Sequence, residues 1–166
     1  MRKIMALIVA LSASVAMAGP MSLYRMYNSS GTDHFYTTDF NEMIRAINGP
    51  YDYEGVAGIC FSTEEAGTVP LYRLYKGGST NDHFYTVSWQ ERDLAIAQHK
   101  YVYEGIACYL YPQQQPGTCP FYRLFGGSDH FYTQSWQEVL IAVGSYGFSY
   151  EGTAGYLLPE SGACPN

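Results

Sequence analysis

The pentapeptide DHFYT occurs three times, at residues 33–37, 82–86 and 129–133. Related segments flank every copy in the same order: LYRMY, LYRLY or FYRLF before it, and YEGVAG, YEGIAC or YEGTAG after it. Equivalent positions are 47 to 50 residues apart, and such a period is typical of repeat architectures. We therefore expect one domain, residues 19–166, made of three repeats at about 21–66, 67–115 and 116–164.

Each repeat contains the patterns of two strands, a short helix and a final strand. The segments 71–75 and 83–86 are rich in aromatic and branched residues and are separated by KGGSTND, which predicts a strand pair. The sequence SWQE at 88–91 and 135–138 fits a helix capping box, and DFNE at 39–42 is its Asp-capped counterpart. Because the capping box explains Glu42, Glu91 and Glu138 structurally, we do not expect them to be catalytic acids. A final Tyr-rich run, such as YVYEGIACYLY, predicts a strand interrupted at Gly105.

These elements predict a mainly β protein. A repeat of this size cannot bury its apolar face alone, so we expect the three copies to close around a pseudo-threefold axis. The predicted fold is a β-trefoil-like domain with a short helix in each repeat. The alternative is a three-unit ββαβ assembly.

The first 18 residues have the three parts of a secretory signal peptide: the basic Arg2-Lys3, an apolar run at 4–15, and Ala-Met-Ala at 16–18. Cleavage there gives a mature chain that starts at Gly19. No later stretch has the roughly 18 to 20 apolar residues that a membrane-spanning helix needs. We expect an exported protein that does not span a membrane and that is periplasmic, extracellular or on the cell surface.

The net charge and the number of cysteines further narrow the class of protein. Removing Arg2 and Lys3 from the nine basic residues leaves seven against 15 acidic ones, a net charge of −8, which argues against nucleic acid as a partner. Four cysteines in an exported chain predict two disulfides. Of three possible connectivities we favour Cys60–Cys108 with Cys119–Cys164, because each bond then joins neighbouring repeats.

Four polar positions, an Arg, an Asp, a His and a Glu, recur in every repeat. Arg73 shares a strand face with Leu71, and Glu104 shares one with Ile106 and Leu110, so both side chains are expected to point inward. Charges buried in this way need partners. We therefore predict one ion pair within each repeat: Arg25–Glu54, Arg73–Glu104 and Arg123–Glu151.

The recurring Asp and His lie at the end of a Gly/Ser-containing loop, where residues often contact ligands. With the following Tyr and a nearby Phe or Trp they offer hydrogen bonds to hydroxyl groups and a flat apolar surface to a sugar ring. The second repeat is expected to hold the best site, because the first has Phe40 in place of Trp and the third has the shortest loop. The alternative is that Asp caps its own turn and His bonds internally. The predicted ligand-binding residues are Asp33, His34, Tyr36, Phe40, Asp82, His83, Tyr85, Trp89, Asp129, His130, Tyr132 and Trp136.

Catalysis is not expected, although an Asp–His pair could in principle act as a general acid and base. Enzymes rarely keep three complete copies of one active site, and the sequence has no nucleophile motif such as G-x-S-x-G. Neighbouring Asp and His on a strand point to opposite faces, so no metal site is predicted. No cofactor is expected.

The motifs VPLYRLY, DHFYT, SWQE and YEGIA resemble a repeat family of bacterial and fungal exported proteins whose function is unknown. Repeats of that family are often appended to secreted or cell-wall hydrolases, and here no hydrolase domain is expected. The resemblance implies a β-trefoil-like module that binds carbohydrate or a cell-surface glycan, without catalytic residues. The alternative function is a structural or protein-interaction role in the cell envelope.

Overall fold

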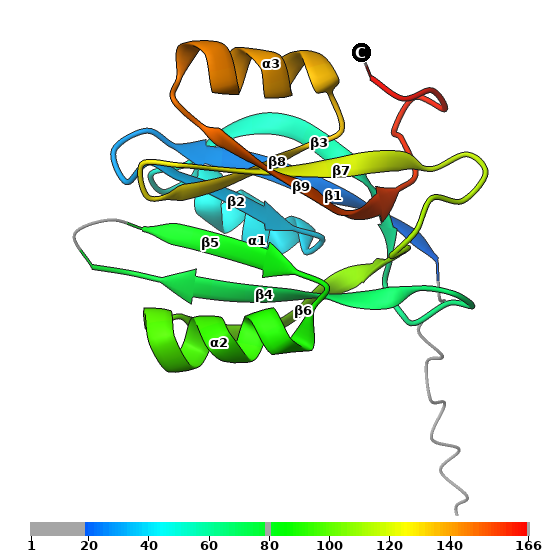
Figure 1. The fold of residues 1–166 in the computed structure, drawn as a ribbon, viewed down its shortest axis with the longest axis horizontal. Coiled ribbons are helices and arrows are strands. Elements are labelled where there is room, and N and C mark those ends of the chain that lie inside the picture. The colour runs from blue at the N-terminus through cyan, green and yellow to red at the C-terminus, as the bar shows by residue number, and fades with distance from the viewer. Residues whose placement is uncertain (1–18, 79–80, 166) are drawn as a thin grey trace, which may run out of the picture.

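The protein, described here by a computed structural model, consists of three successive strand-strand-helix-strand units (Figure 1). The structure describes residues 19–78 and 81–165, so the predicted signal peptide lies outside the described residues. The units are β1 (Pro20–Asn28), β2 (Asp33–Thr37), α1 (Phe40–Ile47) and β3 (Asp52–Phe61); β4 (Val69–Lys76), β5 (Asp82–Thr86), α2 (Trp89–His99) and β6 (Val102–Leu110); β7 (Cys119–Gly126), β8 (Asp129–Thr133), α3 (Trp136–Ser145) and β9 (Ser149–Leu157). The protein is mainly β, as predicted. The element order is that of the ββαβ alternative, and a β-trefoil is not confirmed.

In each unit the first strand lies between the other two and pairs antiparallel with both. The third strands join the units near their ends. Phe61 of β3 pairs with Tyr109 of β6, and single bridges connect Ile59 with Leu158 and Tyr111 with Tyr156. The first two units therefore form one six-stranded sheet, β2-β1-β3-β6-β4-β5, and the third forms a three-stranded sheet, β8-β7-β9, with the helices on the outer faces (Figure 1).

The predicted interruption of the final strand is a change of register at a glycine. Gly105 has φ +120°, a conformation that a residue with a side chain rarely adopts. The pairing of β4 with β6 shifts on either side of the Arg73–Gly105 pair. The shift ends the simple alternation, so Ile106 is 45 % exposed although Cys108 and Leu110 are buried. The prediction that Glu104 points inward from a face shared with Ile106 was wrong for this reason: Glu104 is also exposed, although its side chain pairs with Arg73.

The helices begin at the predicted capping residues. Asp39 accepts hydrogen bonds from the main-chain N–H groups of Asn41 and Glu42, and Ser88 accepts one from Glu91 at 3.2 Å. Ser135 caps α3 in the same way, through the N–H of Glu138. Each cap supplies an acceptor for a donor that has no partner within the helix. The first turn is thereby fixed directly after the DHFYT strand.

The central core forms where the three units meet. Its largest members are Tyr36, Tyr85 and Tyr132, which are at most 1 % exposed, and Leu23, Leu71 and Phe121 pack around them. Smaller cores lie under the helices, as where Met43 packs with Met26 and Phe35. The tyrosines come from the fourth position of each DHFYT segment, so the repeated pentapeptide supplies the centre of the molecule.

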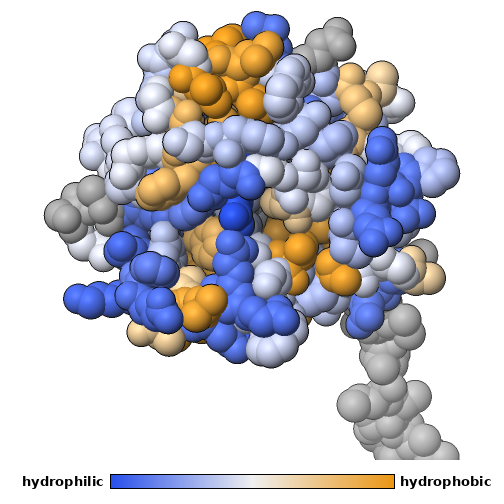
Figure 2. Space-filling model, viewed as in Figure 1, coloured by the Kyte–Doolittle hydropathy of each residue, from blue (hydrophilic) through white to orange (hydrophobic). Residues whose placement is uncertain are grey.

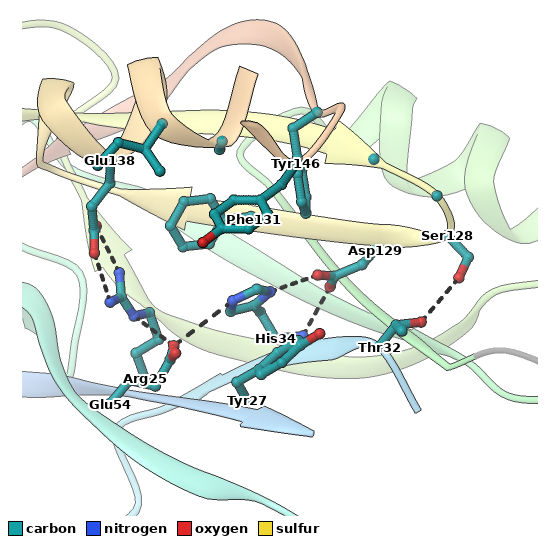
Figure 3. Close-up of a pocket in the computed structure, with 15 residues that line it drawn as sticks. Arg25, Tyr27, Thr32, His34, Glu54, Ser128, Asp129, Phe131, Glu138 and Tyr146 are labelled. Atoms are coloured by element: carbon teal, nitrogen blue, oxygen red, sulfur yellow. Dashed lines mark hydrogen bonds and ion pairs between the residues drawn. The ribbon is translucent and has the colours of Figure 1, made fainter. Parts of the chain in front are cut away.

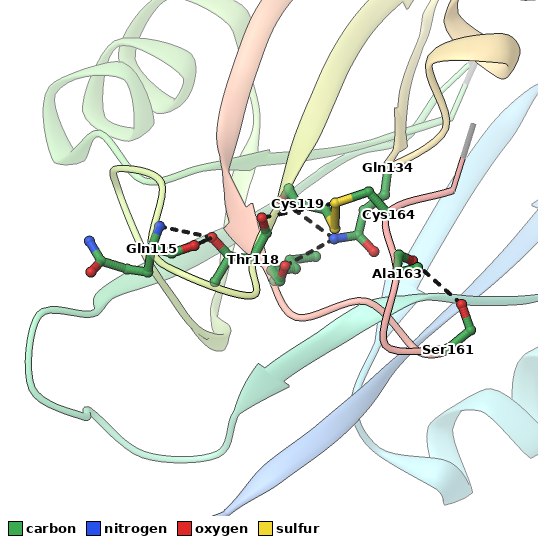
Figure 4. Close-up of a disulfide and its surroundings, with 8 residues drawn as sticks. Gln115, Thr118, Cys119, Gln134, Ser161, Ala163 and Cys164 are labelled. Carbon is green, nitrogen blue, oxygen red and sulfur yellow. Dashed lines mark hydrogen bonds between the residues drawn. A yellow bond between two sulfur atoms is a disulfide. The ribbon is translucent and has the colours of Figure 1, made fainter.

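Two disulfides have the predicted connectivity. Cys60–Cys108 joins β3 to β6 and therefore links the first two units. Cys119–Cys164 ties the C-terminal segment to β7, beside the buried Gln134, whose amide donates to the carbonyl groups of Cys119 and Leu157 (Figure 4). The second bond thus lies within the third unit and its tail, because Cys164 follows β9. The pairing is therefore as predicted, but the expectation that this bond joins two repeats was wrong.

The surface is mixed in character, with an apolar patch over α3 where Leu140, Ile141 and Val143 are exposed (Figure 2). Within the described part of the chain, the helices lack the length and apolar character that a membrane crossing would require.

Candidate binding site

The Asp and His of each DHFYT segment bond to different neighbours. His34 contacts Asp129, His83 contacts Asp33 and His130 contacts Asp82, with Nδ1–Oδ2 distances of 2.6 to 2.7 Å. The main-chain N–H of the same histidine donates to the other carboxylate oxygen at 2.8 to 2.9 Å. Neighbouring side chains on a strand point to opposite faces. The Asp–His dipeptide is therefore a link between units and not a pair within one unit.

Each histidine ring lies between two aromatic rings. His34 is 4.5 Å from Tyr27 and 4.7 Å from Phe131, measured between ring centroids. The other two are held in the same way, His83 by Phe35 and Tyr75, and His130 by Phe84 and Phe125. The histidine side chains are only 11 to 13 % exposed. These contacts fix each ring and leave one edge for further interactions.

The tyrosines of the pentapeptide are not accessible. Each hydroxyl donates to a carbonyl oxygen of another unit at 2.7 Å and accepts from a main-chain N–H at 2.8 to 2.9 Å. These hydrogen bonds form a cycle through Tyr36, Tyr85 and Tyr132. The three tyrosines lie on β2, β5 and β8, which are near the centre of the molecule in Figure 1. The prediction that these three tyrosines contact a ligand needs correction, because the core encloses their rings.

The three predicted Arg–Glu pairs are present, and each arginine also has a second partner. The Nε atoms of Arg25, Arg73 and Arg123 lie 2.8 to 3.0 Å from Glu54, Glu104 and Glu151. Their terminal nitrogens donate in bidentate fashion to Glu138, Glu42 and Glu91, the capping-box glutamates of a neighbouring unit. Sequence reasoning missed this second partner because the capping box already accounts for a glutamate at this position.

These bonds change the acidity of the glutamates. Burial disfavours the ionised carboxylate of Glu138, but hydrogen bonds from Arg25 and Thr133 outweigh it and lower the pKa of the carboxyl. The pKa values of Glu42 and Glu91 are lowered for the same reasons. The pKa of Asp33 is also lowered, because bonds from His83 and Tyr51 outweigh its burial. These four carboxyls are therefore ionised at neutral pH, and the arginines that bind the three glutamates compensate the charge of those glutamates.

Oxygen atoms of Asp33, Asp82 and Asp129 lie within 4.8 Å of one another. All three residues are buried, and each carboxylate accepts the two bonds from a histidine described above. A cation would have to share oxygens that already hold the units together. We assign this cluster a structural role.

Phe40, Trp89 and Trp136 lie apart from the Asp–His links. Each is the first residue of a helix and is 44 to 56 % exposed. Asp82, His83, Tyr85 and Trp89, which the sequence favoured as one site, therefore do not converge. Asp82 bonds to His130, Tyr85 lies in the core and Trp89 lies on the outside.

A cavity of about 730 Å³ lies between the first and third units (Figure 3). Its polar wall is a row of contacts from Glu138 through Arg25, Glu54 and His34 to Asp129, in which the Glu54–His34 distance is 3.7 Å. Its apolar wall comes from β8 and α3 and from the segment after α3. The residues of this wall are Phe131, Ile141, Ala142, Tyr146 and Phe148.

Two departures from the repeat pattern lie at this cavity. The hydroxyls of Tyr51 and Tyr101 donate to Asp33 and Asp82, whereas the equivalent residue beside Asp129 is Phe148, which has no hydroxyl. The β7–β8 connector, residues 127–128, is also the shortest of the three. Gly126 permits the close approach of Phe148, since a Cβ atom there would lie 2.7 Å from Cγ of the ring. The cavity thus lies beside the short loop of the third repeat. From the sequence we expected the best binding site in the second repeat instead.

Of the predicted ligand-binding residues, the cavity brings together His34 and Asp129. Sequence reasoning missed Tyr27, Phe131, Tyr146 and Phe148. The available indication was the third repeat itself, where Phe148 replaces a tyrosine that the other two repeats keep.

Comparison with known proteins gives one result. A family model described as a domain of unknown function, DUF5648, matches residues 22–158. No curated protein and no solved structure matches the chain.

Proposed function

The chain belongs to the DUF5648 family, a domain of unknown function, and we propose from its geometry that it is a non-catalytic carbohydrate-binding module. The observation that carries the proposal is the cavity between the first and third units, where a row of charged groups faces aromatic rings. Ligand cavities typically have volumes of about 300–1,000 Å³ and combine apolar walls with a few polar groups. This cavity of about 730 Å³ fits that description.

The chemistry of the two walls suits a sugar. Glu54 and Asp129 are acceptors for hydroxyl groups, and Arg25 is a donor. Opposite them, the exposed ring of Tyr146 offers flat apolar surface to the C–H face of a sugar ring, while Phe131 packs on His34 and Arg25 and holds the polar wall in place. Thr32 and Ser128, whose hydroxyl oxygens are 3.5 Å apart, add polar groups at the rim (Figure 3).

A binding role fits the His34–Asp129 contact better than catalysis does. The same contact recurs at His83–Asp33 and His130–Asp82, where it joins units. A group used three times to hold the fold together is poorly placed to change its protonation state during a reaction. The two disulfides suit an oxidising compartment, so we place the ligand outside the cytoplasm.

The test is a glycan array followed by titration of each hit against the purified protein and two variants. Tyr146→Ala removes an exposed aromatic wall, and we expect affinity to fall about tenfold or more. Phe148→Tyr restores the residue of the other two repeats and should place a hydroxyl in the cavity toward Asp129. We expect it to lower affinity while the protein remains folded.

His99→Ala is the matched control, because His99 occupies the position of Tyr146 in the second unit and does not line the cavity. It should bind as the unmodified protein does. Absence of any glycan hit, or equal binding by the folded Tyr146→Ala variant, would show that the cavity is not a sugar site.

A further inference from the structure

Each unit carries an aromatic cluster on its outer face, built on a tyrosine from its first strand and a tyrosine from its third strand, and in each unit the helix begins at an aromatic residue. The centroids of the two tyrosine rings are 6.4, 6.1 and 6.1 Å apart in the first, second and third units. The first cluster is Tyr24, Phe40 and Tyr53, and the third is Tyr122, Trp136 and Tyr150; in both, the ring of the helix residue contacts a strand tyrosine. The second cluster is the pair Tyr72–Tyr103, and Trp89 holds the equivalent helix position in that unit. None of these residues lines the cavity described above.

In the second unit an arginine of the chain covers the tyrosine pair. The guanidinium carbon of Arg92 is 4.6 Å from the ring centroid of Tyr72 and 5.3 Å from that of Tyr103. Asp93 holds the same guanidinium, with its Oδ1 2.8 Å from Nε. A cation over the face of an aromatic ring at these distances is attracted by the ring's quadrupole. The protein itself thus shows which chemical group the cluster accepts.

The other two units do not supply this arginine. The helix position of Arg92 is occupied by Met43 in the first unit and Val139 in the third, and both side chains are buried in the local cores. The rings of the first and third clusters stay in reach of solvent: Phe40, Tyr53, Trp136 and Tyr150 are all more than 40 % exposed. Among the described residues, the tyrosine pairs of the first and third units therefore have a similar spacing but no arginine at the position of Arg92.

We infer that the first and third aromatic clusters bind arginine side chains of a basic partner peptide, in the way that the second binds Arg92. The charge of the protein is complementary, since the chain has a formal net charge of −6. An acidic group also acts on the first cluster: after burial, the charge of Glu160 is the next cause that raises the pKa of Tyr53. In the third cluster the Trp136 ring is 5.1 Å from Tyr122 and 5.7 Å from Tyr150, and indole is the most favourable ring for a cation.

The chain contains two tryptophans, which gives an internal control: Trp136 lies in an open cluster, and Trp89 begins the helix whose Arg92 covers the second tyrosine pair. The purified protein is titrated with a short alternating Gly–Arg peptide while the indole N–H signals are followed by NMR. The signal of Trp136 should shift and that of Trp89 should stay. In Arg92→Gln, which uncovers the Tyr72–Tyr103 pair, both signals should shift.

Two comparisons complete the test. Tyr150→Ala should weaken the response of Trp136 by about two- to fivefold, the value of one exposed cation–π contact. Tyr146→Ala, the cavity variant, should leave peptide binding unchanged, so this result and the sugar result are independent. The inference is overturned if the Trp136 signal does not move, if a Gly–Lys peptide of equal length shifts it equally, or if Arg92→Gln leaves Trp89 unaffected.

Discussion

At the scale of single residues, the recurring arginine binds one carboxylate of its own unit and one of a neighbouring unit. Arg73 bonds through Nε to Glu104 of its own unit and through its terminal nitrogens to Glu42 of the preceding unit. Its guanidinium carbon also lies 5.3 Å from the ring centroid of Phe35. An arginine suits this place because its planar fork binds two carboxylates and stacks on a ring, which a lysine cannot do.

Arg73→Met should therefore lower the free energy of unfolding by about 2–3 kcal/mol. Breaking a fully buried pair costs ~3–5 kcal/mol, and here the loss is smaller because Glu42 and Glu104 keep 29 % of their side-chain surface exposed. Urea denaturation measures the change. Arg45→Met is the matched control: Arg45 is 69 % exposed and 4.0 Å from Asp39, so its pair is worth at most ~1 kcal/mol. Equal losses in the two variants would contradict the ion-pair account.

At the scale of elements, the DHFYT strand and the following helix form one rigid piece. The threonine that ends each strand donates to the capping-box glutamate, as Thr86 does to Glu91, and its hydroxyl also accepts from the N–H of the cap residue. Glu91 in turn receives Arg123 of the third unit. The first turn of the helix therefore also forms the contact between one unit and the next.

Ser88→Ala should cost about 1 kcal/mol of stability, because it removes the acceptor for the N–H of Glu91. Ser88→Asp should restore most of that stability, since Asp39 already caps α1 with the same backbone conformation. Thermal unfolding followed by circular dichroism compares the three proteins. A Ser88→Asp variant as unstable as Ser88→Ala would show that the hydroxyl acts in some other way.

At the scale of the whole molecule, the three units are joined by bonds that run in one cyclic direction. Tyr85 bonds to the main chain at Tyr36, Tyr132 to that at Tyr85, and Tyr36 to that at Tyr132. Removing one link leaves polar main-chain groups in the centre of the core. The cycle therefore makes the stability of each unit depend on the other two.

Tyr85→Phe should lower stability by about 2–4 kcal/mol, because the N–H and C=O groups of Tyr36 each lose a partner and an unsatisfied buried group costs ~1–3 kcal/mol. The transition should stay cooperative, with all probes reporting one midpoint. Tyr146→Phe, which removes a hydroxyl from a residue 73 % exposed, should be nearly neutral. A Tyr85→Phe protein as stable as the unmodified one would mean that the cycle is not a source of stability.

The sequence by itself determined the local features: three repeats, the strand and helix order, the helix caps and the Arg–Glu pairs within units. These depend on residues a few positions apart or on alternation along one strand, so they can be read from the chain. The alternation failed where the register shifts near Gly105 and exposes Ile106, and equivalent shifts occur near Gly55 and Gly152.

Only the tertiary structure decided which unit supplies the partner of each repeated residue. Three nearly identical repeats offer the same Asp, His and Tyr, so the sequence cannot distinguish a contact inside a unit from one between units. Packing the strands around a common core settles it: Asp33 bonds to His83, the tyrosines become the centre, and a cavity opens beside Phe148. The physical reason is that partner choice among equivalent groups depends on the relative placement of whole units, and no local pattern encodes that placement.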